Sequence, residues 1–353
     1  MMKRRVLLVL LVFFCAACGT SRQDSIVLLV TQDGVRWQEV FGGAQEALID
    51  SKDNESRQEF LRDTAEARRE ALMPFLWTVV ARQGQIYGNR EKGSAAQVTN
   101  GKKFSYPGYS EFLTGSPDPR INSNGKLPNP NVNVLEWLEK QPGFKGRTAS
   151  FGTWDRLPYI LNRERSGLYI VAGEEPIPDE PLTERQAAIN DLKRDTPDPW
   201  YGNPFDSFSF QAALEHLRLH RPRVLYLMLG ETDEWAHEGN YRQYLLATRR
   251  TDRFVRTLWE AAQQMSPGRV SLLFTTDHGR GDGPEWKTHG EKIEGAENVW
   301  VALMGPKVAA LGERSSAPMV TSSQVAATVA EFAGQDYAAA FPRVAKPIGV
   351  GPR

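Results

Sequence analysis

Apolar and β-branched residues gather along this chain in short continuous runs, each suited to a strand buried on both faces of a sheet. The runs are Ser25–Thr31 (SIVLLVT), Arg147–Trp154, Val224–Gly230, Ser271–Thr276 and Asn298–Met304. Between them, apolar residues recur with helical spacing at Arg57–Arg82 (interrupted at Pro74), Asn133–Lys140, Phe208–His220, Tyr241–Met265 and Ser322–Ala333. This alternation predicts an α/β fold, with a mainly parallel sheet that carries helices on both faces.

The length of 353 residues suits one large α/β domain, and apolar residues make up 41% of it, enough for a substantial core. The segment Glu174–Pro204 is rich in proline and acidic residues and lacks periodicity. We interpret it as an insert over the end of the sheet that carries the active site, with a plain surface excursion as the alternative. The sequence therefore predicts a leader over residues 1–17 and a single domain over residues 18–353.

The leader differs in character from the rest of the chain. Basic Lys3–Arg5 precede an unbroken apolar run, Val6–Phe14, and then small residues up to Cys18. This order predicts a secretory signal peptide, because the run is shorter than the roughly 20 residues of a membrane-spanning helix. A retained N-terminal anchor is the alternative. Cys18 resembles the lipid-bearing cysteine of bacterial lipoproteins, although Cys15 stands where leucine is usual. We therefore expect an exported protein, periplasmic or anchored to the membrane through lipidated Cys18.

Both cysteines of the chain lie in or beside this leader. The folded domain therefore has no disulfide, no thiolate nucleophile and no thiolate metal ligand, so any metal must be held by His, Asp and Glu. The 43 basic and 43 acidic residues balance, without the clustered basic excess that is typical of a nucleic-acid-binding surface.

Polar residues that suit metal chemistry follow three of the predicted strands. Asp33 comes after the first apolar run, Asp233 after the third, and Asp277 with His278 after the fourth. Ligands of open α/β sheets bind beyond the carboxyl ends of the strands. We therefore expect these side chains to meet at one edge of the sheet.

The spacing of these residues also suits shared metal ligands. Asp233 and His237 are four residues apart, which places both on one face of a helical turn. A capped helix with a surface histidine is the alternative. Asp277 and His278 lie at a strand-to-loop turn, where adjacent side chains can serve two neighbouring metals, although an aspartate that caps the next element competes with this interpretation. His289 follows in a loop that can return over the site.

Three histidines and three aspartates thus form the candidate ligand set: Asp33, Asp233, Asp277, His237, His278 and His289. Such a mixed set suits zinc, with other divalent ions possible. Two ions roughly 4 Å apart can activate a nucleophile and hold both oxygens of an in-line displacement. The remaining histidines, His216 and His220, lie on a predicted helix and are interpreted as structural or surface residues.

The order of these motifs resembles the alkaline phosphatase superfamily, over about Ile26 to Gly334. The elements that carry the resemblance are Asp33-Gly34, a hydroxyl residue near position 100, Asp233-x-x-x-His237, Asp277-His278-Gly279 and His289. The nucleotide pyrophosphatase/phosphodiesterase branch is the most similar. Glu231-Thr232-Asp233 resembles its Glu-Pro-Asp, and Phe104-Ser105-Tyr106-Pro107 resembles its nucleophile segment, with serine in place of threonine. Thr321–Gly334 resembles the closing helix of the superfamily.

This resemblance implies a two-metal hydrolase of small phosphate esters, a phosphodiesterase with two divalent ions, zinc by analogy. The implied nucleophile is Ser105, activated by coordination and passing through a phospho-serine intermediate. One implied ligand set contains Asp33, Ser105, Asp277 and His278, and the other contains Asp233, His237 and His289. Either Asn122 or Asn124 would donate to a phosphate oxygen. Lys102 and Lys103 are interpreted as solvated surface charges.

Some positions depart from the family pattern. Ala236 replaces the glycine before the histidine, and Tyr109 stands where phosphodiesterases have histidine and sulfatases have arginine. Two alternatives therefore stay open: a phosphomonoesterase or sulfatase-like hydrolase, and a non-catalytic envelope lipoprotein that binds a ligand. Four aromatic residues suit either stacking on a nucleobase or sugar or packing in the core: Trp154, Trp200, Tyr201 and Trp235. The sequence leaves the leaving group and the oligomeric state open.

Overall fold

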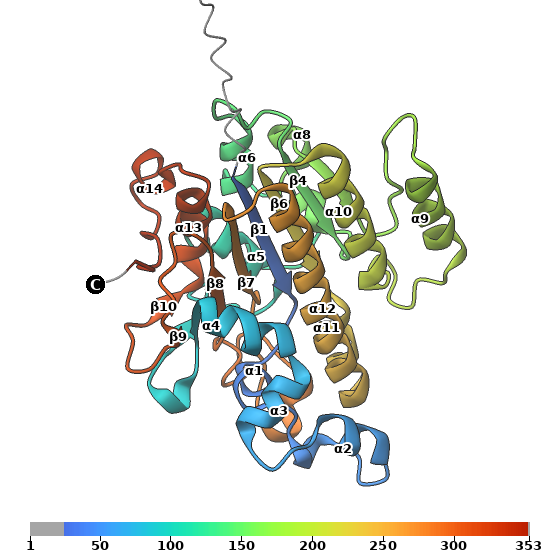
Figure 1. Cartoon of the computed structure of the whole chain (residues 1–353), viewed down its shortest axis with the longest axis vertical. Coiled ribbons are helices and arrows are strands. Elements are labelled where there is room, and N and C mark those ends of the chain that lie inside the picture. The colour runs from blue at the N-terminus through green and yellow to red at the C-terminus, as the bar shows by residue number, and fades with distance from the viewer. Residues whose placement is uncertain (1–24, 352–353) are drawn as a thin grey trace, which may run out of the picture.

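An eight-stranded sheet lies at the centre of the computed structural model, which describes residues 25–351 (Figure 1). The strand order is β5-β4-β6-β1-β7-β8-β2-β9, and only β8 runs antiparallel to its neighbours within this sheet. The strands are β1 (Ile26–Gln32), β2 (Gly84–Tyr87), β4 (Thr148–Gly152), β5 (Tyr169–Ala172), β6 (Val224–Leu229), β7 (Val270–Thr275), β8 (Val301–Met304) and β9 (Gly312–Glu313). A smaller sheet pairs β3 (Ala96–Gln97) with β10 (Val320–Thr321). The predicted mainly parallel sheet is confirmed.

The central strand β1 is buried on both faces, as its unbroken apolar sequence predicts. Leu28 and Val30 pack into one hydrophobic cluster, whereas Val27 and Leu29 pack into the other. Successive side chains of a strand point to opposite faces, so each face of the sheet needs its own apolar partners. The core is therefore divided by the sheet into two layers.

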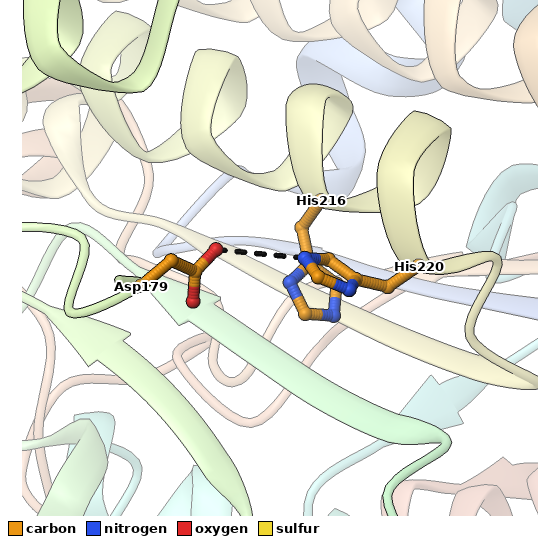
Figure 2. Close-up of side chains that lie close together, drawn as sticks. All are labelled: Asp179, His216 and His220. Atoms are coloured by element: carbon orange, nitrogen blue, oxygen red, sulfur yellow. Dashed lines mark ion pairs between the residues drawn. The ribbon is translucent and has the colours of Figure 1, made fainter. Parts of the chain in front are cut away.

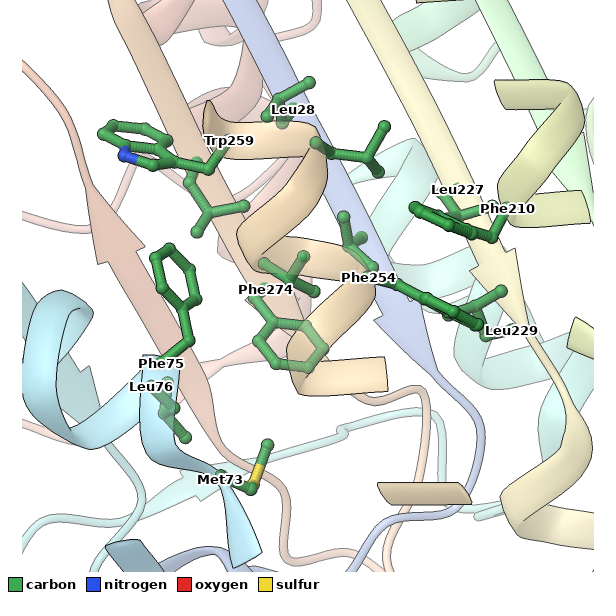
Figure 3. Packing of buried hydrophobic residues seen from close by; sticks show 14 of the residues in the cluster. Leu28, Met73, Phe75, Leu76, Phe210, Leu227, Leu229, Phe254, Trp259 and Phe274 are labelled. Carbon is green, nitrogen blue, oxygen red and sulfur yellow. The ribbon is translucent and has the colours of Figure 1, made fainter. Parts of the chain in front are cut away.

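The first layer is covered by the longest helices of the fold. Figure 3 shows its centre, where Phe254 from α12 lies beside Phe210 from α10, with the two rings stacked at 4.0 Å. Full burial of such a side chain stabilises the fold by roughly 1.5–3 kcal/mol. The elements on this face are α1 (Trp37–Gly42), α2 (Asn54–Phe60), α3 (Ala65–Leu72), the π-helix η2 (Leu76–Val80), α4 (Ala81–Gln83), α10 (Asp206–His220) and α12 (Tyr241–Met265).

The second layer is covered by shorter helices: α5 (Ser105–Thr114), α6 (Val134–Glu139), α7 (Leu157–Ile160) and α13 (Val325–Phe332). Short elements complete the described chain: η1 (Glu46–Leu48), η3 (Arg90–Lys92), α8 (Arg163–Ser166), α11 (Glu231–His237), η4 (Gly283–Lys287), η5 (Ser322–Gln324) and α14 (Tyr337–Ala340).

The helical pattern over Arg57–Arg82 is divided more finely than predicted. Helix α2 ends at Phe60, and α3 starts after Thr64, whose side chain accepts a hydrogen bond from the backbone N–H of Ala67. This hydroxyl satisfies one of the free N–H groups at a helix start, so a new helix begins there. The predicted interruption at Pro74 is confirmed, because α3 ends at Leu72, but the prediction of a continuous helix before it is wrong.

The predicted insert also contains regular structure. Helix α9 (Glu184–Asp195) begins with a capping box between Thr183 and Gln186 and packs beside α10, beyond the edge of the sheet (Figure 1). Only the last part of the insert reaches the carboxyl end of β6, where Asn203 donates to Glu234 at 2.7 Å. The segment is thus an edge extension that contains a helix, which its lack of periodicity did not indicate.

The predicted signal peptide, residues 1–17, and the candidate lipidation site Cys18 lie outside the described residues. Export and lipidation therefore stay predictions. Among residues 25–351, no helix has both the length and the apolar character that a membrane crossing requires.

Candidate metal centre and nucleophile

The three predicted aspartates meet because their strands are neighbours. β6, β1 and β7 are adjacent and parallel, with Gln32 of β1 opposite Leu229 of β6 and Thr31 opposite Thr275 of β7. The residues that follow the strands therefore leave the sheet at the same edge. This register places Asp33 and Asp277 together, with the helix that carries Asp233 beside them.

The most buried part of the site contains Asp33, Asp277 and His278. Asp33 is 4% exposed, and the other two are fully buried. The Nε2 atom of His278 lies 3.3 Å from Oδ1 of Asp33 and 3.5 Å from Oδ2 of Asp277. These two carboxylate oxygens are buried and accept no hydrogen bond. Buried acceptors without partners are rare, so the pair is suited to a bound cation.

The turn after β1 requires glycine. Gly34 has a φ of +60°, and its N–H donates to Oδ1 of Asp277 at 3.1 Å. A Cβ at this position would lie 2.9 Å from side-chain atoms of both Arg280 and Asp233. Conformation and space therefore exclude a side chain, and the glycine allows Asp277 and Asp233 to approach the same turn.

The candidate nucleophile lies against this buried group. Ser105 is the first residue of α5, is 5% exposed, and its Oγ lies 3.5 Å from Nε2 of His278. One turn later, Gly108 packs so closely on the end of β7 that an added Cβ would lie 2.3 Å from the carbonyl oxygen of Asp277. The start of a helix favours negative charge, so an anion would be stabilised beside the Ser105 hydroxyl.

The second group of predicted ligands lies toward solvent. The Nε2 atom of His237 is 3.2 Å from Oδ2 of Asp233 and 3.0 Å from Nε2 of His289. The His289 ring stacks on His278 at 4.0 Å, which joins the second group to the first. The side chain of His237 is 45% exposed, compared with 10% for His289. The site is therefore closed at the aspartates and open at His237.

The electrostatics of the two groups differ. Burial, and then the charge of Asp33, raise the pKa of Asp277 well above its usual value. Burial alone lowers the pKa of His278, but Asp277 and Asp33 outweigh it and raise that pKa to about 9. Burial, followed by the charges of His278 and Arg280, lowers the pKa of His289 far below its usual value. The inner group thus needs positive charge, and the outer imidazole is held neutral, the form that binds metal.

The donor set fits divalent cations. Two sets each bring their ligand atoms within 4.8 Å of one another: Asp33, Asp277 and His278, and Asp233, His278 and His289. Mixed carboxylate and imidazole donors suit zinc and related ions. The structure thus brings all six predicted ligands and Ser105 into one region. The division of these ligands between two ions stays a prediction.

Two residues at the site were not predicted to act there. The buried guanidinium of Arg280 donates to the carbonyl oxygens of Gly34 and Lys287 and forms an ion pair with Asp233. It therefore ties together three segments that carry candidate ligands. The hydroxyl of Tyr109 donates to Oδ2 of Asp33 at 2.9 Å. Arg280 directly follows the Asp277-His278-Gly279 motif. Because a positively charged side chain is not expected beside a metal site, its position in the sequence does not indicate this role.

The two predicted asparagines differ in position. Oδ1 of Asn124 accepts from the backbone N–H of Tyr106, which places Asn124 beside the start of α5. Asn122 is exposed and makes no hydrogen bond within the described part of the chain. Lys102 pairs with Glu291, and Lys103 pairs with Glu297. The two lysines are therefore engaged in ion pairs, and Asn124 is the better placed of the two amides.

Solved structures with the same fold are similar to this chain, whereas no protein-family model and no curated protein sequence matches it. The protein i-CgsB in complex with k-i-k-neocarrahexaose has a TM-score of 0.56 at 17% identity, over 92% of this chain and 75% of its own. The lipoteichoic acid synthase LtaP from Listeria monocytogenes has a TM-score of 0.56 at 12% identity, over 90% and 73%. An inactive form of the murine ectonucleotide pyrophosphatase/phosphodiesterase 5, in complex with AMP, has a TM-score of 0.52 at 9% identity, over 88% and 96%.

These proteins are members of the alkaline phosphatase superfamily, and the third belongs to its nucleotide pyrophosphatase/phosphodiesterase branch. The chain has the alkaline phosphatase fold, as the order of its motifs predicted.

Proposed function

We propose that this protein is a two-metal hydrolase of phosphate esters, a phosphodiesterase that uses Ser105 as its nucleophile. One observation carries the proposal. The Oγ atom of Ser105 lies 3.5 Å from Nε2 of His278, and the same Nε2 faces two buried carboxylate oxygens that lack hydrogen bonds. A hydroxyl, an imidazole and two unpaired carboxylates in one buried place suit cation-assisted phosphoryl transfer.

In this proposal, Asp33, Asp277 and His278 would hold one divalent ion, and Asp233, His237 and His289 the other. When bound, the ions would lower the pKa of the serine hydroxyl and neutralise charge on the phosphoryl oxygens. Ser105 Oγ would bond to phosphorus as the bond to the leaving alcohol breaks. Water would then cleave the phospho-serine bond, which returns the serine and releases the phosphoryl product.

The preference for a diester rests on the engaged cations around the site. A phosphate monoester dianion carries one more negative charge than a diester and needs more positive charge to bind. Arg280 is held by Gly34, Lys287 and Asp233, so its guanidinium already has its acceptors. A diester, with its single charge, is the substrate class that this arrangement favours.

The leaving group would meet aromatic surface at the open side of the site. Trp235 lies on α11 between Asp233 and His237, and its ring meets Trp200 of the insert edge to face at 4.8 Å. The neighbouring Tyr201 is 95% exposed. Trp235 also packs against the first core layer, so the exposed ring of Tyr201 is the one that favours recognition of a base or sugar by stacking. Trp154 differs, because it packs against Tyr109 at 6.4 Å.

The comparisons support the same chemical class. The murine relative is described with AMP, and a phosphonate monoester hydrolase from Silicibacter pomeroyi has a TM-score of 0.53 at 14% identity, over 89% of this chain and 74% of its own. Both names refer to esters at phosphorus. We extend that class of substrate, and not a particular molecule, to this chain. Export through the leader and attachment through Cys18 would place the enzyme in the periplasm or at the membrane surface.

The direct test is turnover of bis-p-nitrophenyl phosphate, p-nitrophenyl phosphate and p-nitrophenyl sulfate, each with and without added zinc. We expect zinc-dependent cleavage, with the phosphate diester preferred. Ser105→Ala should abolish turnover while zinc stays bound. Ser110→Ala is the matched control, because Ser110 lies on the same helix, is buried, and contacts Asn129 rather than the candidate ligands.

The outcomes separate the alternatives. Preferred cleavage of the monoester or the sulfate ester would replace the diesterase with the corresponding alternative. Folded protein that binds no zinc and cleaves none of the three esters would favour the non-catalytic ligand-binding lipoprotein. Full activity in Ser105→Ala would refute the assigned nucleophile.

A further inference from the structure

A second group of metal-binding side chains lies outside the candidate site. Figure 2 shows Asp179, His216 and His220 close together, with both imidazoles directed from α10 toward the segment that carries Asp179. One ligand atom from each residue lies within 4.8 Å of the other two. The Nε2 atom of His220 is 3.5 Å from Oδ2 of Asp179. From sequence, His216 and His220 were interpreted as structural or surface residues. Asp179 was not predicted as their partner.

The two histidines converge because they are four residues apart at the end of one helix. This spacing places them on the same face of α10, with ring centroids 4.4 Å apart. Two helical histidines at this spacing form a frequent half of a zinc site, which a carboxylate from another segment can complete.

The carboxylate of Asp179 is held in place before any ion binds. Its Oδ1 accepts from the hydroxyl of Tyr169 at 2.8 Å, and its Oδ2 accepts from the side-chain amide of Gln186. Carboxylates that bind metals are usually oriented by such hydrogen bonds. Tyr169 belongs to the edge strand β5 and Gln186 to α9, so two elements fix the direction in which Asp179 faces His220.

The state of His216 supports a ligand role. The residue is 8% exposed, and its Nδ1 atom is buried without a hydrogen-bond partner. Its ring lies 4.5 Å from the ring of Tyr169 and 5.3 Å from that of Phe151, so the surroundings are aromatic. A buried imidazole nitrogen without a hydrogen-bond partner is available to a metal ion.

The place of this group in the fold separates it from the candidate site. Helix α10 begins at Asp206, whose carboxylate accepts from Gly230 at the carboxyl end of β6. The helix ends at His220, just before β6 begins at Val224. The histidines therefore lie at the amino ends of the strands, opposite the edge that carries Ser105.

We infer that Asp179, His216 and His220 form a separate site for one transition-metal ion, zinc being the ion that the donors suit best. The half-exposed side of His220 leaves room for water as a fourth ligand. The ion would fasten the edge segment that contains α9 to helix α10. Its function is structural, and it does not depend on the proposed hydrolase activity.

The experiment measures zinc bound per chain after dialysis against buffered free zinc, by elemental analysis of the whole protein. His220→Ala and Asp179→Asn should each lose about one equivalent of zinc relative to the unmodified protein. Leu219→Ala should lose none. It is the matched control because Leu219 is the adjacent helical residue and is 46% exposed, compared with 47% for the His220 side chain. Circular dichroism verifies that each variant is folded.

A second background isolates this site from the candidate catalytic metals. His278→Ala/His289→Ala protein lacks an imidazole from each candidate catalytic ligand set, so added cobalt should still produce the visible absorption of a site with nitrogen ligands. Adding His220→Ala to this background should remove that absorption and weaken zinc binding by more than about 100-fold, beyond the effect of losing one orienting hydrogen bond. Zinc should also raise the unfolding temperature of the double variant, and should not raise it once His220→Ala is added.

Equal zinc content in His220→Ala, Asp179→Asn and Leu219→Ala would overturn the inference. His220 and Asp179 would then form only an ion pair beside a packed His216. Loss of all zinc from the His278→Ala/His289→Ala protein, together with full zinc content in His220→Ala, would also overturn it. Neither result bears on whether Ser105 cleaves phosphate esters, so the two proposals succeed or fail separately.

Discussion

The contact between α5 and the end of β7 gives the sharpest prediction, through Gly108→Ala. An added Cβ would lie 2.3 Å from the carbonyl oxygen of Asp277 and 3.0 Å from its carbonyl carbon. These are backbone atoms, so no side-chain rotation can relieve the clash. Ordinary contact begins at 3.4 Å, so α5 and the strand end must separate by about 1 Å. Ser105 lies one turn earlier on α5 and would move with it.

The expected magnitudes follow from this displacement. Forcing a methyl group into a packed interface costs about 1–3 kcal/mol, whereas alanine in a helix is more favourable than glycine by about 0.5–1 kcal/mol. The free energy of unfolding should therefore fall by up to about 2.5 kcal/mol. A nucleophile moved by about 1 Å loses roughly 100-fold in turnover. That loss raises the activation free energy by about 2.7 kcal/mol, at least as much as the change in stability.

Urea denaturation measures the first quantity, and zinc-dependent cleavage of bis-p-nitrophenyl phosphate measures the second. Gly42→Ala is the matched control, because Gly42 ends helix α1 and an added Cβ there meets nothing within 4 Å. The control should be unchanged or slightly stabilised, with normal turnover. A Gly108→Ala protein that is as stable and as active as this control would refute the close packing of α5 on Asp277 and its role in placing Ser105.

Three further substitutions test the surroundings of the site and the core. Tyr109→Phe removes the hydrogen bond to Asp33. Zinc affinity in a competition titration should fall by about 10- to 100-fold, while the free energy of unfolding changes by only about 1–2 kcal/mol. Unchanged affinity would contradict the role of Tyr109 in orienting Asp33. Arg280→Met leaves Asp233 without its buried partner and should lower the free energy of unfolding by roughly 3–5 kcal/mol, with a loss of zinc. A stable, zinc-loaded variant would refute the role of Arg280 in holding the ligand segments together. Asp252 is buried, and burial raises its pKa to about 7 despite hydrogen bonds from two backbone N–H groups, so the native state retains a proton that the unfolded chain releases near pH 4. The stability that this proton provides is complete below about pH 4 and is lost as the pH rises toward 7, by up to roughly 4 kcal/mol. Urea denaturation across that range should show the loss in the unmodified protein and less of it in Asp252→Asn; parallel profiles would contradict the assigned pKa.

The strands that could be identified from sequence are those with long, unbroken apolar runs. The apolar runs at β1, β6 and β7 are long enough to be buried on both faces, and the parallel sheet follows from their alternation with helices. The strands β2 (GQIY) and β5 (YIVA) were missed, because each has only four residues and forms through pairing with a neighbour. Short strands of this kind are specified by tertiary contacts more than by local pattern.

Helix α9 was missed for a different reason. Its local signal was present, because Thr183 and Gln186 have the spacing of a capping box. The side chain of each residue accepts a hydrogen bond from the backbone N–H of the other. The surrounding prolines and acidic residues led to an interpretation based on composition. A signal at the start of a helix was therefore more informative than the average character of the segment that contains it.

The candidate site was predictable where strand order determines it. Asp33, Asp233 and Asp277 could be expected together because each follows a buried parallel strand or begins the helix after one. The position of Arg280 was not predictable in the same way. Its guanidinium connects Gly34, Asp233 and Lys287, which are brought together only by the folded loops.

Tyr109 shows how a departure from a family pattern can retain a positional function. It lies one turn after Ser105 on α5, fully buried, and its hydroxyl donates to Oδ2 of Asp33. Burial, and then the charges of Asp277 and Asp33, raise the pKa of Tyr109 far above its usual value, so the phenol keeps the proton that it donates. A neutral donor orients the carboxylate without neutralising it, and Oδ1 of Asp33 stays unpaired beside His278. An arginine at this position would supply a positive charge of its own and compete with a cation. The residue that weakens the sequence resemblance is thus the one that keeps the negative charge of Asp33 available for metal.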